Sequence, residues 1–231
     1  MTVPAPDTRI IVFARAPEPG AVKTRLIPLL GAARAAALQR ILIDHALATA
    51  FAAGIGPVEL WCAPSAQHPL LAHCAERHAV AAASQCGGDL GARMLHAAAA
   101  TLAIAQRVII IGNDCPALTA GDLQRAAAAL AGDHDAVLIP AEDGGYVLIG
   151  LRCCDARLFT DIGWGSSRVM ATTRERLATL GWRWCELQSS WDVDRPVDYQ
   201  RLVASGIIPH LEQALGASQP SFPGPRAVRK F

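Results

Sequence analysis

The sequence lacks the features that mark several large classes of protein. Its 231 residues carry a formal net charge of +1, so there is no overall field of the kind that attracts nucleic acid or a membrane surface. No uninterrupted apolar run is long enough to span a bilayer, and the first residues do not have the pattern of a secretory leader. The seven cysteines contain no CxxC pair and no spacing typical of a zinc site. We therefore expect a cytoplasmic protein with reduced thiols, no membrane span and no nucleic-acid partner.

Common nucleotide-binding and catalytic motifs are missing as well. The chain has neither the GxxxxGK[ST] pattern of a P-loop nor a GxGxxG turn. Its seven histidines are scattered, and no Ser-His-Asp or Cys-His constellation stands out. Any binding of an anion must therefore depend on a local group of basic residues.

The apolar content is sufficient for one well-buried domain. Hydrophobic residues make up 52% of the chain, and no internal repeat or linker divides it. We expect a single domain over residues 1–215. Residues 216–231 are rich in Pro, Gly and Ser with a basic end, which predicts a flexible C-terminal tail.

Strand and helix patterns alternate through this domain. Short apolar runs predict strands at 9–14, 57–63, 107–112, 135–141 and 183–188, and helix formers predict helices at 31–54, 66–78, 88–105, 119–132, 167–180, 196–204 and 209–215. Another strand within 143–151 follows after a short turn, which allows a hairpin or an antiparallel edge pairing. The pattern predicts an α/β fold with a mostly parallel central sheet and helices on both faces.

A basic loop follows the first predicted strand. The stretch FARAPEPGAVKTRL, residues 13–26, begins near Arg15, turns at two prolines and Gly20, and then carries Lys23 and Arg25. In an open α/β sheet, ligands bind beyond the carboxyl ends of the strands, where glycine lets the backbone approach and Arg or Lys can hold phosphate. The loop therefore predicts a phosphate site. The alternative is a solvated loop whose cations pair with nearby carboxylates.

Carboxylates follow two of the later strands. Asp114 comes after the strand at 107–112, and Asp192 and Asp194 follow the strand at 183–188. Residues two apart on an extended segment share a face, so Asp192 and Asp194 can both look into one cleft. Oxygen ligands suit Mg²⁺, and Asp114 can hold such an ion against a phosphate. Helix capping or an Asx turn explains Asp114 equally well.

Glycine-rich turns supply the remaining candidates. One turn precedes a helix and could hold the base and ribose, or could simply be a capped helix start. Another turn and a Trp-Gly pair could form a wall for the substrate, or could be an ordinary tight turn and a core tryptophan. The residues are Gly88, Asp89 and Arg93 for the nucleotide, and Asp143, Gly144, Gly145, Tyr146, Trp164 and Gly165 for the substrate.

Six stretches, taken in order, resemble a known family. They are ARAPEPGAVKTRL, QCGGDLGARM, GNDCPALT, DGGYVLIGL, WGSS and DVDRPVDYQRL, and the resemblance runs from about Ile10 to Ala204. The family is the bacterial glycosyltransferase-like family of the GT-A type, sometimes labelled as associated with arsenosugar biosynthesis or with radical-SAM proteins. More distantly, the stretches resemble nucleotidyltransferases, including molybdenum-cofactor and phospholactate guanylyltransferases and CMP-sugar synthetases. Six motifs in order are far more specific than any one of them.

The resemblance implies a fold, a cofactor and roles for the residues. The fold is the Rossmann-like GT-A fold of nucleotide-diphospho-sugar transferases, and the cofactor is Mg²⁺ or Mn²⁺. Arg195 stands where related synthetases have Thr, and Asn113 where many relatives have Ser or Thr. The implied roles are phosphate binding for Ala14, Arg15, Gly20, Lys23, Thr24 and Arg25, metal binding for Asp114, Asp194 and, beside them, Asp192, and catalysis for Lys23, Asp114 and Asp194.

The same machinery is compatible with more than one activity. The family implies a glycosyltransferase that uses a nucleotide-diphospho-sugar and a small-molecule acceptor. Attack on the α-phosphorus of a nucleoside triphosphate would instead make the protein a nucleotidyltransferase that releases pyrophosphate. A nucleotide-binding module without turnover is a third reading, which two acidic sites disfavour because a pure binder need not hold a metal ion at the scissile bond.

Overall fold

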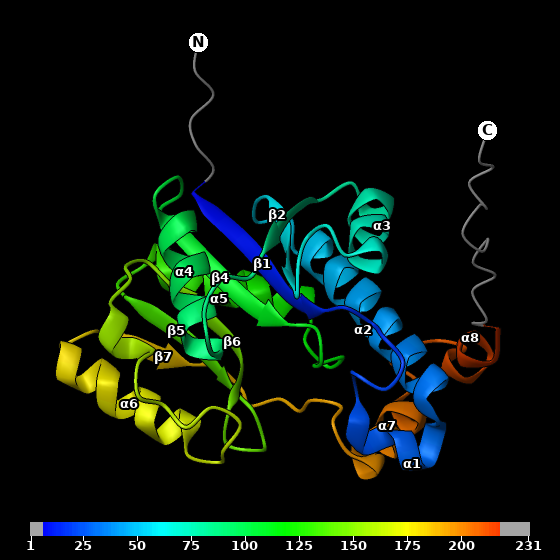
Figure 1. Ribbon diagram of the computed structural model, residues 1–231. Helices are drawn as coiled ribbons and strands as arrows, with labels where there is room; N and C mark the ends of the chain where they lie inside the picture. The colour runs from blue at the N-terminus through cyan, green and yellow to red at the C-terminus, as the bar shows by residue number, and fades with distance from the viewer. Residues whose placement is uncertain (1–6, 218–231) are drawn as a thin grey trace, which may run out of the picture.

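A single seven-stranded sheet runs through the computed structural model, which describes residues 7–217 (Figure 1). The strand order is β3-β2-β1-β4-β6-β5-β7. Strand β6 is antiparallel to its neighbours β4 and β5, and the other neighbouring pairs are parallel. The strands are β1 Thr8–Arg15, β2 Val58–Ala63, β3 Ala81–Ser84, β4 Arg107–Gly112, β5 Ala136–Pro140, β6 Tyr146–Leu151 and β7 Trp184–Glu186.

Helices cover both faces of this sheet, which confirms the predicted α/β class. Helices α2, α3 and α5 pack on one face, and α4, α6 and the short η2 pack on the other. The bounds are η1 Thr24–Leu26, α1 Ile27–Leu30, α2 Ala32–Ala53, α3 Pro69–His78, α4 Leu90–Leu102, α5 Ala120–Ala131, η2 Ala156–Leu158, α6 Val169–Leu180, α7 Pro196–Ser205 and α8 Leu211–Ala217. Among the described residues, none of these helices has the length and apolarity to cross a membrane.

Strand β1 shows why the sheet is buried on both sides. Ile10 and Val12 belong to the cluster under α2, α3 and α5, whereas Ile11 and Phe13 belong to the cluster under α4 and α6. Because successive side chains of a strand point to opposite faces, a strand covered on both sides must be apolar at every position. The run IIVF meets that requirement. Polar side chains that could bind a ligand are therefore expected at the strand ends.

A third apolar cluster lies beyond the end of the sheet. Helices α1, α7 and α8 gather there against the first turns of α2 (Figure 1). Trp191 and Val193 belong to the same cluster, so the segment that leads from β7 to α7 is anchored where it passes the carboxyl ends of the strands. This anchoring fixes the backbone on which Asp192 and Asp194 stand.

Several predicted boundaries are close, and a few assignments need correction. Gly31 and Gly54 flank α2 as predicted, and Thr119 caps α5 in a capping box with Asp122. The hairpin alternative for β6 is confirmed, because β6 pairs antiparallel with β5, and the edge alternative is wrong, because β6 lies between β4 and β5. The sequence gives no sign of β3, η1 or α1. Of the predicted tail, Gly216 and Ala217 close α8, and residues 218–231 lie outside the described part.

The strand order places a ligand crevice at one position. Strand β2 lies on one side of β1 and β4 lies on the other, so the chain changes direction across the sheet at β1. In open α/β sheets, ligands bind outside the carboxyl ends of the strands at such a switch point. The ends of β1 and β4, at Arg15 and Gly112, are therefore where a site is expected.

Candidate active site

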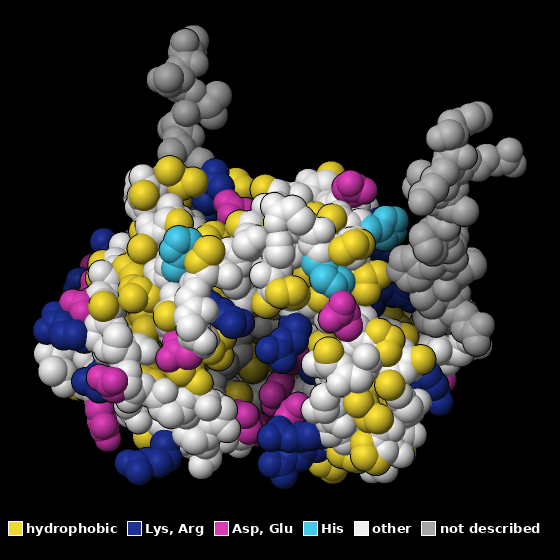
Figure 2. Space-filling model, in the orientation of Figure 1, with side chains coloured by type: hydrophobic (Ala, Val, Ile, Leu, Met, Phe, Trp, Pro, Cys, Tyr) yellow, Lys and Arg dark blue, Asp and Glu magenta, His cyan; other side chains and the backbone are white. Residues whose placement is uncertain are grey.

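A cavity of about 580 Å³ opens at this switch point. Figure 2 shows a central hollow on the face of the molecule, flanked by basic and acidic side chains. Its volume lies within the range of about 300–1,000 Å³ that is usual for ligand pockets. The residues that line it and were predicted to form the site are Ala14, Arg15, Asp89, Arg93, Asp114, Asp143, Gly145, Tyr146, Trp164, Gly165 and Asp192.

Lys23 turns toward the carboxylates rather than toward open space. Its backbone has φ 48° and ψ 39°, and its side chain is 5% exposed. The ammonium Nζ donates to Asp114 Oδ1 at 2.6 Å and to the carbonyl oxygen of Val193 at 2.7 Å. Since a buried ammonium is stable only with such partners, Lys23 ties the basic loop to the end of β4 and to the segment before α7.

Ala14 and Arg15 of the basic loop line the cavity, whereas Gly20, Thr24 and Arg25 do not. Arg25 forms an exposed ion pair with Asp194, and Thr24 begins η1. Gly20 occupies a turn with φ 85°, a conformation that glycine adopts without strain. The expectation that Asp192 and Asp194 look into one cleft is therefore met by Asp192 alone.

Three carboxylates that line the cavity influence one another electrostatically. Burial is the main cause that raises the pKa of Asp192 to about 6, and the nearby charges of Asp143 and Asp114 raise it further. The Lys23 ammonium lowers it only in part. The backbone helps to hold this arrangement, because Val193 N donates to the carbonyl oxygen of Asp114 at 2.8 Å. Carboxylates held this close to one another are a favourable set of ligands for a divalent cation.

Two basic side chains also line the cavity. Arg15 and Arg93 line it, and both also line a second hollow of about 340 Å³ beside the loop that follows β1. Arg93 Nε donates to the carbonyl oxygen of Gly87 at 3.2 Å, which holds its guanidinium near the start of α4. The two hollows share these two arginines, whose guanidinium groups suit contact with a polyphosphate.

An aromatic wall closes the cavity on the side of α4. Tyr146 and Trp164 meet edge to face, with ring centroids 6.3 Å apart and an interplanar angle of 88°. Burial raises the pKa of the Tyr146 phenol, which therefore stays neutral. A Cβ on Gly91 would lie 2.6 Å from Trp164 Nε1 and 2.3 Å from the carbonyl oxygen of Phe159, so this position requires glycine.

Turn residues fix the mouth of the cavity. Asp89 caps α4, because its side chain accepts from Ala92 N at 2.7 Å, and Gly88 precedes it outside the lining. Gly144 has φ 92°, and a Cβ there would lie 2.2 Å from the carbonyl oxygen of Ser167. The carbonyl oxygen of Gly144 accepts from Met170 N at 2.8 Å. The turn before β6 is thus locked onto the start of α6.

Three polar residues that the sequence did not assign to the site belong to it or support it, because Asn113 and Gln85 line the cavity and Gln39 contacts Asn113. Gln39 of α2 is buried, and its Nε2 lies 3.4 Å from both Asn113 Oδ1 and the carbonyl oxygen of Arg15. Asn113 Nδ2 in turn donates to Asp114 Oδ1 at 3.0 Å. Gln85 donates to the carbonyl oxygen of Trp61 at 2.8 Å. A lone glutamine in an alanine-rich helix gives no sequence signal of such a role.

Solved structures of transferases have the same fold. A "putative nucleotide-diphospho-sugar transferase" from Desulfovibrio desulfuricans G20 is 28% identical with a TM-score of 0.80, over 91% of this chain and 97% of that one. A cytidylyltransferase from Leptospira borgpetersenii is 14% identical with a TM-score of 0.55, over 94% and 99%. A CMP:2-keto-3-deoxy-manno-octonic acid synthetase complexed with CTP is 12% identical with a TM-score of 0.55, over 86% and 98%. These neighbours confirm the predicted fold and agree with the expected transferase class.

A family model matches the central part of the chain. It covers residues 46–166, and its description is "Uncharacterized protein conserved in bacteria (DUF2064)". The matched range includes β2 to β6 and therefore the ends of both β2 and β4 at the cavity. No curated protein matches the sequence.

Proposed function

We propose that this chain, which belongs to the bacterial family DUF2064, is a metal-dependent glycosyltransferase that uses a nucleotide-diphospho-sugar and a small-molecule acceptor. The single observation that carries the proposal is the charge pattern of the cavity. Arg15 and Arg93 line it together with Asp114, Asp143 and Asp192. The likeness to the Desulfovibrio desulfuricans protein over 91% of this chain supports the same donor class.

The carboxylate cluster has the chemistry of a Mg²⁺ or Mn²⁺ site. Its donors are oxygen atoms, which these ions prefer, and the pKa of Asp192 is raised by burial first and by the charges of Asp143 and Asp114 in addition. Asp114 and Asp192 would hold the ion, with Asp143 beside them. When bound, it would neutralise charge on the donor diphosphate and on the leaving nucleoside diphosphate. Asp194 can join this set only if its pair with Arg25 opens.

The protein's own side chains would orient the donor. Arg15 and Arg93 would contact the phosphates, and their planar forks suit bidentate contact with phosphate oxygens. Lys23 acts as a positioning residue in the described geometry, because its ammonium holds Asp114 and the backbone beside Asp192 at a fixed separation. Such preorganisation favours the charge distribution of the transition state.

The aromatic wall provides the place for the group that is transferred and for its acceptor. Tyr146 and Trp164 line the cavity next to Asp143, so a sugar could lie on their rings with its hydroxyls toward the carboxylates. Closure of this side by apolar surface would also limit water, which competes with the acceptor for the activated sugar. A link to arsenosugar biosynthesis or to radical-SAM proteins is supported only by the sequence resemblance.

Nucleotidyl transfer is the second candidate. The structural neighbours that favour it are the cytidylyltransferase and the synthetase whose structure holds CTP, both of which share the fold over most of this chain. In that reaction the acceptor would attack the α-phosphorus, and the cation would hold the departing pyrophosphate instead of a nucleoside diphosphate. The same residues would serve, so the two candidates differ in their product.

Product analysis separates the candidates. The protein is incubated with Mg²⁺ or Mn²⁺ and, in turn, with each nucleoside triphosphate and each UDP-, GDP- or dTDP-sugar, in the presence of pools of small-molecule acceptors. Release of nucleoside diphosphate from a nucleotide-sugar is the expected result. Release of pyrophosphate from a nucleoside triphosphate would contradict glycosyl transfer and identify the reaction as nucleotidyl transfer. Tight metal-dependent binding of a nucleotide without any product would contradict both and support a non-catalytic module.

A further inference from the structure

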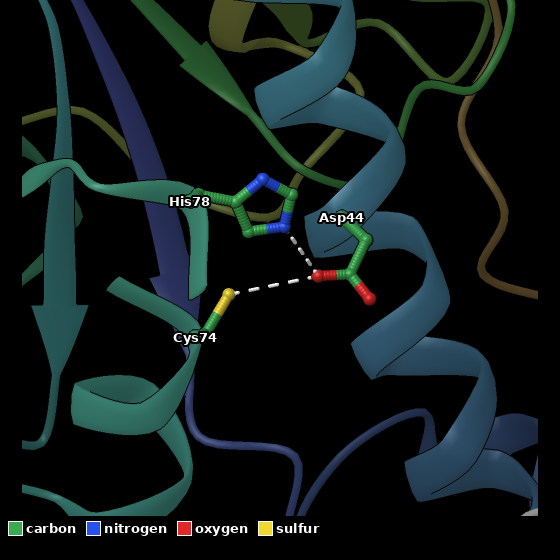
Figure 3. Close-up of side chains that lie close together, drawn as sticks. All are labelled: Asp44, Cys74 and His78. Carbon is green, nitrogen blue, oxygen red and sulfur yellow. Dashed lines mark hydrogen bonds and ion pairs between the residues drawn. The ribbon is translucent and has the colours of Figure 1, made fainter. Parts of the chain in front are cut away.

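A second cluster of metal-ligand side chains lies away from the cavity, between α2 and α3. Cys74 and His78 stand on α3 and point toward Asp44 on α2 (Figure 3). One potential ligand atom from each of the three residues lies within 4.8 Å of the other two. None of these residues lines the cavity at the carboxyl ends of the strands. The cluster is therefore separate from the proposed transferase site.

The local sequence explains why these side chains meet. Cys74 and His78 are four residues apart on a helix, which places them one above the other on the same face. That face packs against α2, because Leu71, Cys74 and Ala75 belong to the same apolar cluster as Ala46 and Ala50. Asp44 stands at the edge of this contact and is 25% exposed, so its carboxylate reaches both residues.

Two of the three distances between the candidate ligand atoms approach those of a tetrahedral zinc centre, and the third is within 4.8 Å. Asp44 Oδ1 lies 3.7 Å from Cys74 Sγ and 2.8 Å from His78 Nε2. Zinc bonds of about 2.0–2.3 Å require neighbouring ligand atoms roughly 3.3–3.8 Å apart. The sulfur already stands at that separation from the oxygen, and the imidazole needs to move by only about half an ångström. His78 is 20% exposed, which leaves an approach for an ion from solvent.

A positively charged side chain, Arg77, lies next to these potential ligands. The guanidinium of Arg77 forms an ion pair with Asp44 Oδ1, and its Nη2 lies 3.4 Å from His78 Nε2. Arg77 thus neutralises the carboxylate in the way that a metal ion would. Its side chain is 48% exposed, so it can turn into solvent without breaking the apolar contact between the helices.

We propose that Asp44, Cys74 and His78 bind Zn²⁺, with water as the fourth ligand, and that the ion fastens α3 to α2. Thiolate, imidazole and carboxylate are the ligands that Zn²⁺ accepts, whereas Mg²⁺ prefers oxygen alone. On binding, a Zn–S bond forms, the S–H bond of Cys74 breaks, and the proton passes to the buffer. His78 binds as the neutral imidazole, Asp44 as the carboxylate, and Arg77 leaves its pair.

Zinc binding is measured on the full chain after treatment with a chelator. Equilibrium dialysis against Zn²⁺ is performed with excess Mg²⁺, which occupies the oxygen-only cluster of the cavity, and Co²⁺ serves as a spectroscopic probe for thiolate ligation. The wild type is expected to hold about one Zn²⁺ per chain at this site and to give thiolate-to-cobalt absorption. Cys74→Ser and His78→Gln should each weaken binding at least about tenfold, and Cys74→Ser should abolish that absorption.

Matched controls separate this cluster from the other cysteines and histidines. His73→Gln changes an exposed histidine of the same helix, and Cys86→Ser changes an exposed cysteine, so both should bind Zn²⁺ as the wild type does. Arg77→Gln removes the competing cation and should bind more tightly than the wild type. If Cys74→Ser does not fold, His78→Gln carries the test because its side chain is partly exposed. Absence of Zn²⁺ binding in the wild type, or unchanged binding in folded His78→Gln, would overturn the proposal.

Discussion

Asp192 in the cavity and Asp44 between α2 and α3 are partly buried carboxylates in opposite surroundings. Asp192 faces Asp143 and Asp114, and burial together with their charges raises its pKa to about 6. Asp44 instead has the Arg77 guanidinium and the His78 imidazole as partners. The first cluster is held together against its own repulsion by the surrounding fold, whereas the second is stable without any ligand. Sites of chemistry commonly carry such electrostatic strain.

Asp114→Asn should produce the largest effect. The amide is nearly the same shape but cannot serve as an anionic ligand, so kcat for the proposed transfer should fall about 10²–10³-fold. Its oxygen can still accept from Lys23, so the protein should fold at a cost of about 1–3 kcal/mol. Steady-state kinetics and urea denaturation measure the two quantities. Asp133→Asn is the control, because that side chain is 89% exposed and does not line the cavity. A turnover number equal to the wild type would remove Asp114 from the metal site.

Asp192→Asn tests the strain in the cavity through the pH dependence of stability. The native carboxyl binds its proton up to about pH 6, whereas the reference value is 3.8. The native state therefore holds more protons in this window, and the free energy of unfolding should fall as the pH rises through it, by about 1–3 kcal/mol in total. The variant lacks this titration, so it should be more stable than the wild type at pH 8 and equal to it below about pH 3.8.

Urea denaturation of both proteins between pH 3 and pH 8, without divalent ions, checks this expectation. Asp133→Asn again serves as the control, because it leaves Asp192 in place and should therefore follow the pH dependence of the wild type. A lower stability of Asp192→Asn at pH 8 would mean that the Asp192 carboxylate is favourably paired, and the contrast with Asp44 would disappear. Added Mg²⁺ should stabilise the wild type at pH 8 and the variant less, because the variant lacks one ligand.

The fold was predictable because its signals are local and periodic. The apolar run of β1, the glycines around α2 and the cap of α5 each specify one element, and their alternation specifies a covered parallel sheet. The position of β6 between β4 and β5 is not local information, since a strand after a short turn can join either side of its partner. Strand β3 has the sequence AAAS, which favours helix, and pairing with β2 overrides that propensity.

The sequence predicted which residues lie at the candidate site better than it predicted which of them contact one another. The ordered motifs bring Arg15, Asp114 and Tyr146 to one cavity, as expected for residues at strand ends. The partner of Lys23 could not be read from the sequence, because it depends on how the loop after β1 closes over Asp114. The cluster on α3 also gives a weak signal. Its cysteine and histidine are four residues apart on a helix, and the third ligand comes thirty residues earlier.

Asp194→Asn should produce the smallest effect, and it decides which acid of the segment before α7 belongs to the cavity. Asp194 is 41% exposed, and its partner Arg25 is 63% exposed, so the pair is screened by water. Loss of such a pair should change the free energy of unfolding by no more than about 1 kcal/mol, and less at high salt. Arg25→Gln should give the same small change, because it removes the same interaction. If Asp194→Asn instead lowers kcat as far as Asp114→Asn does while Arg25→Gln does not, then Asp194 leaves its pair to bind the ion, and the metal site is formed only when the donor is present.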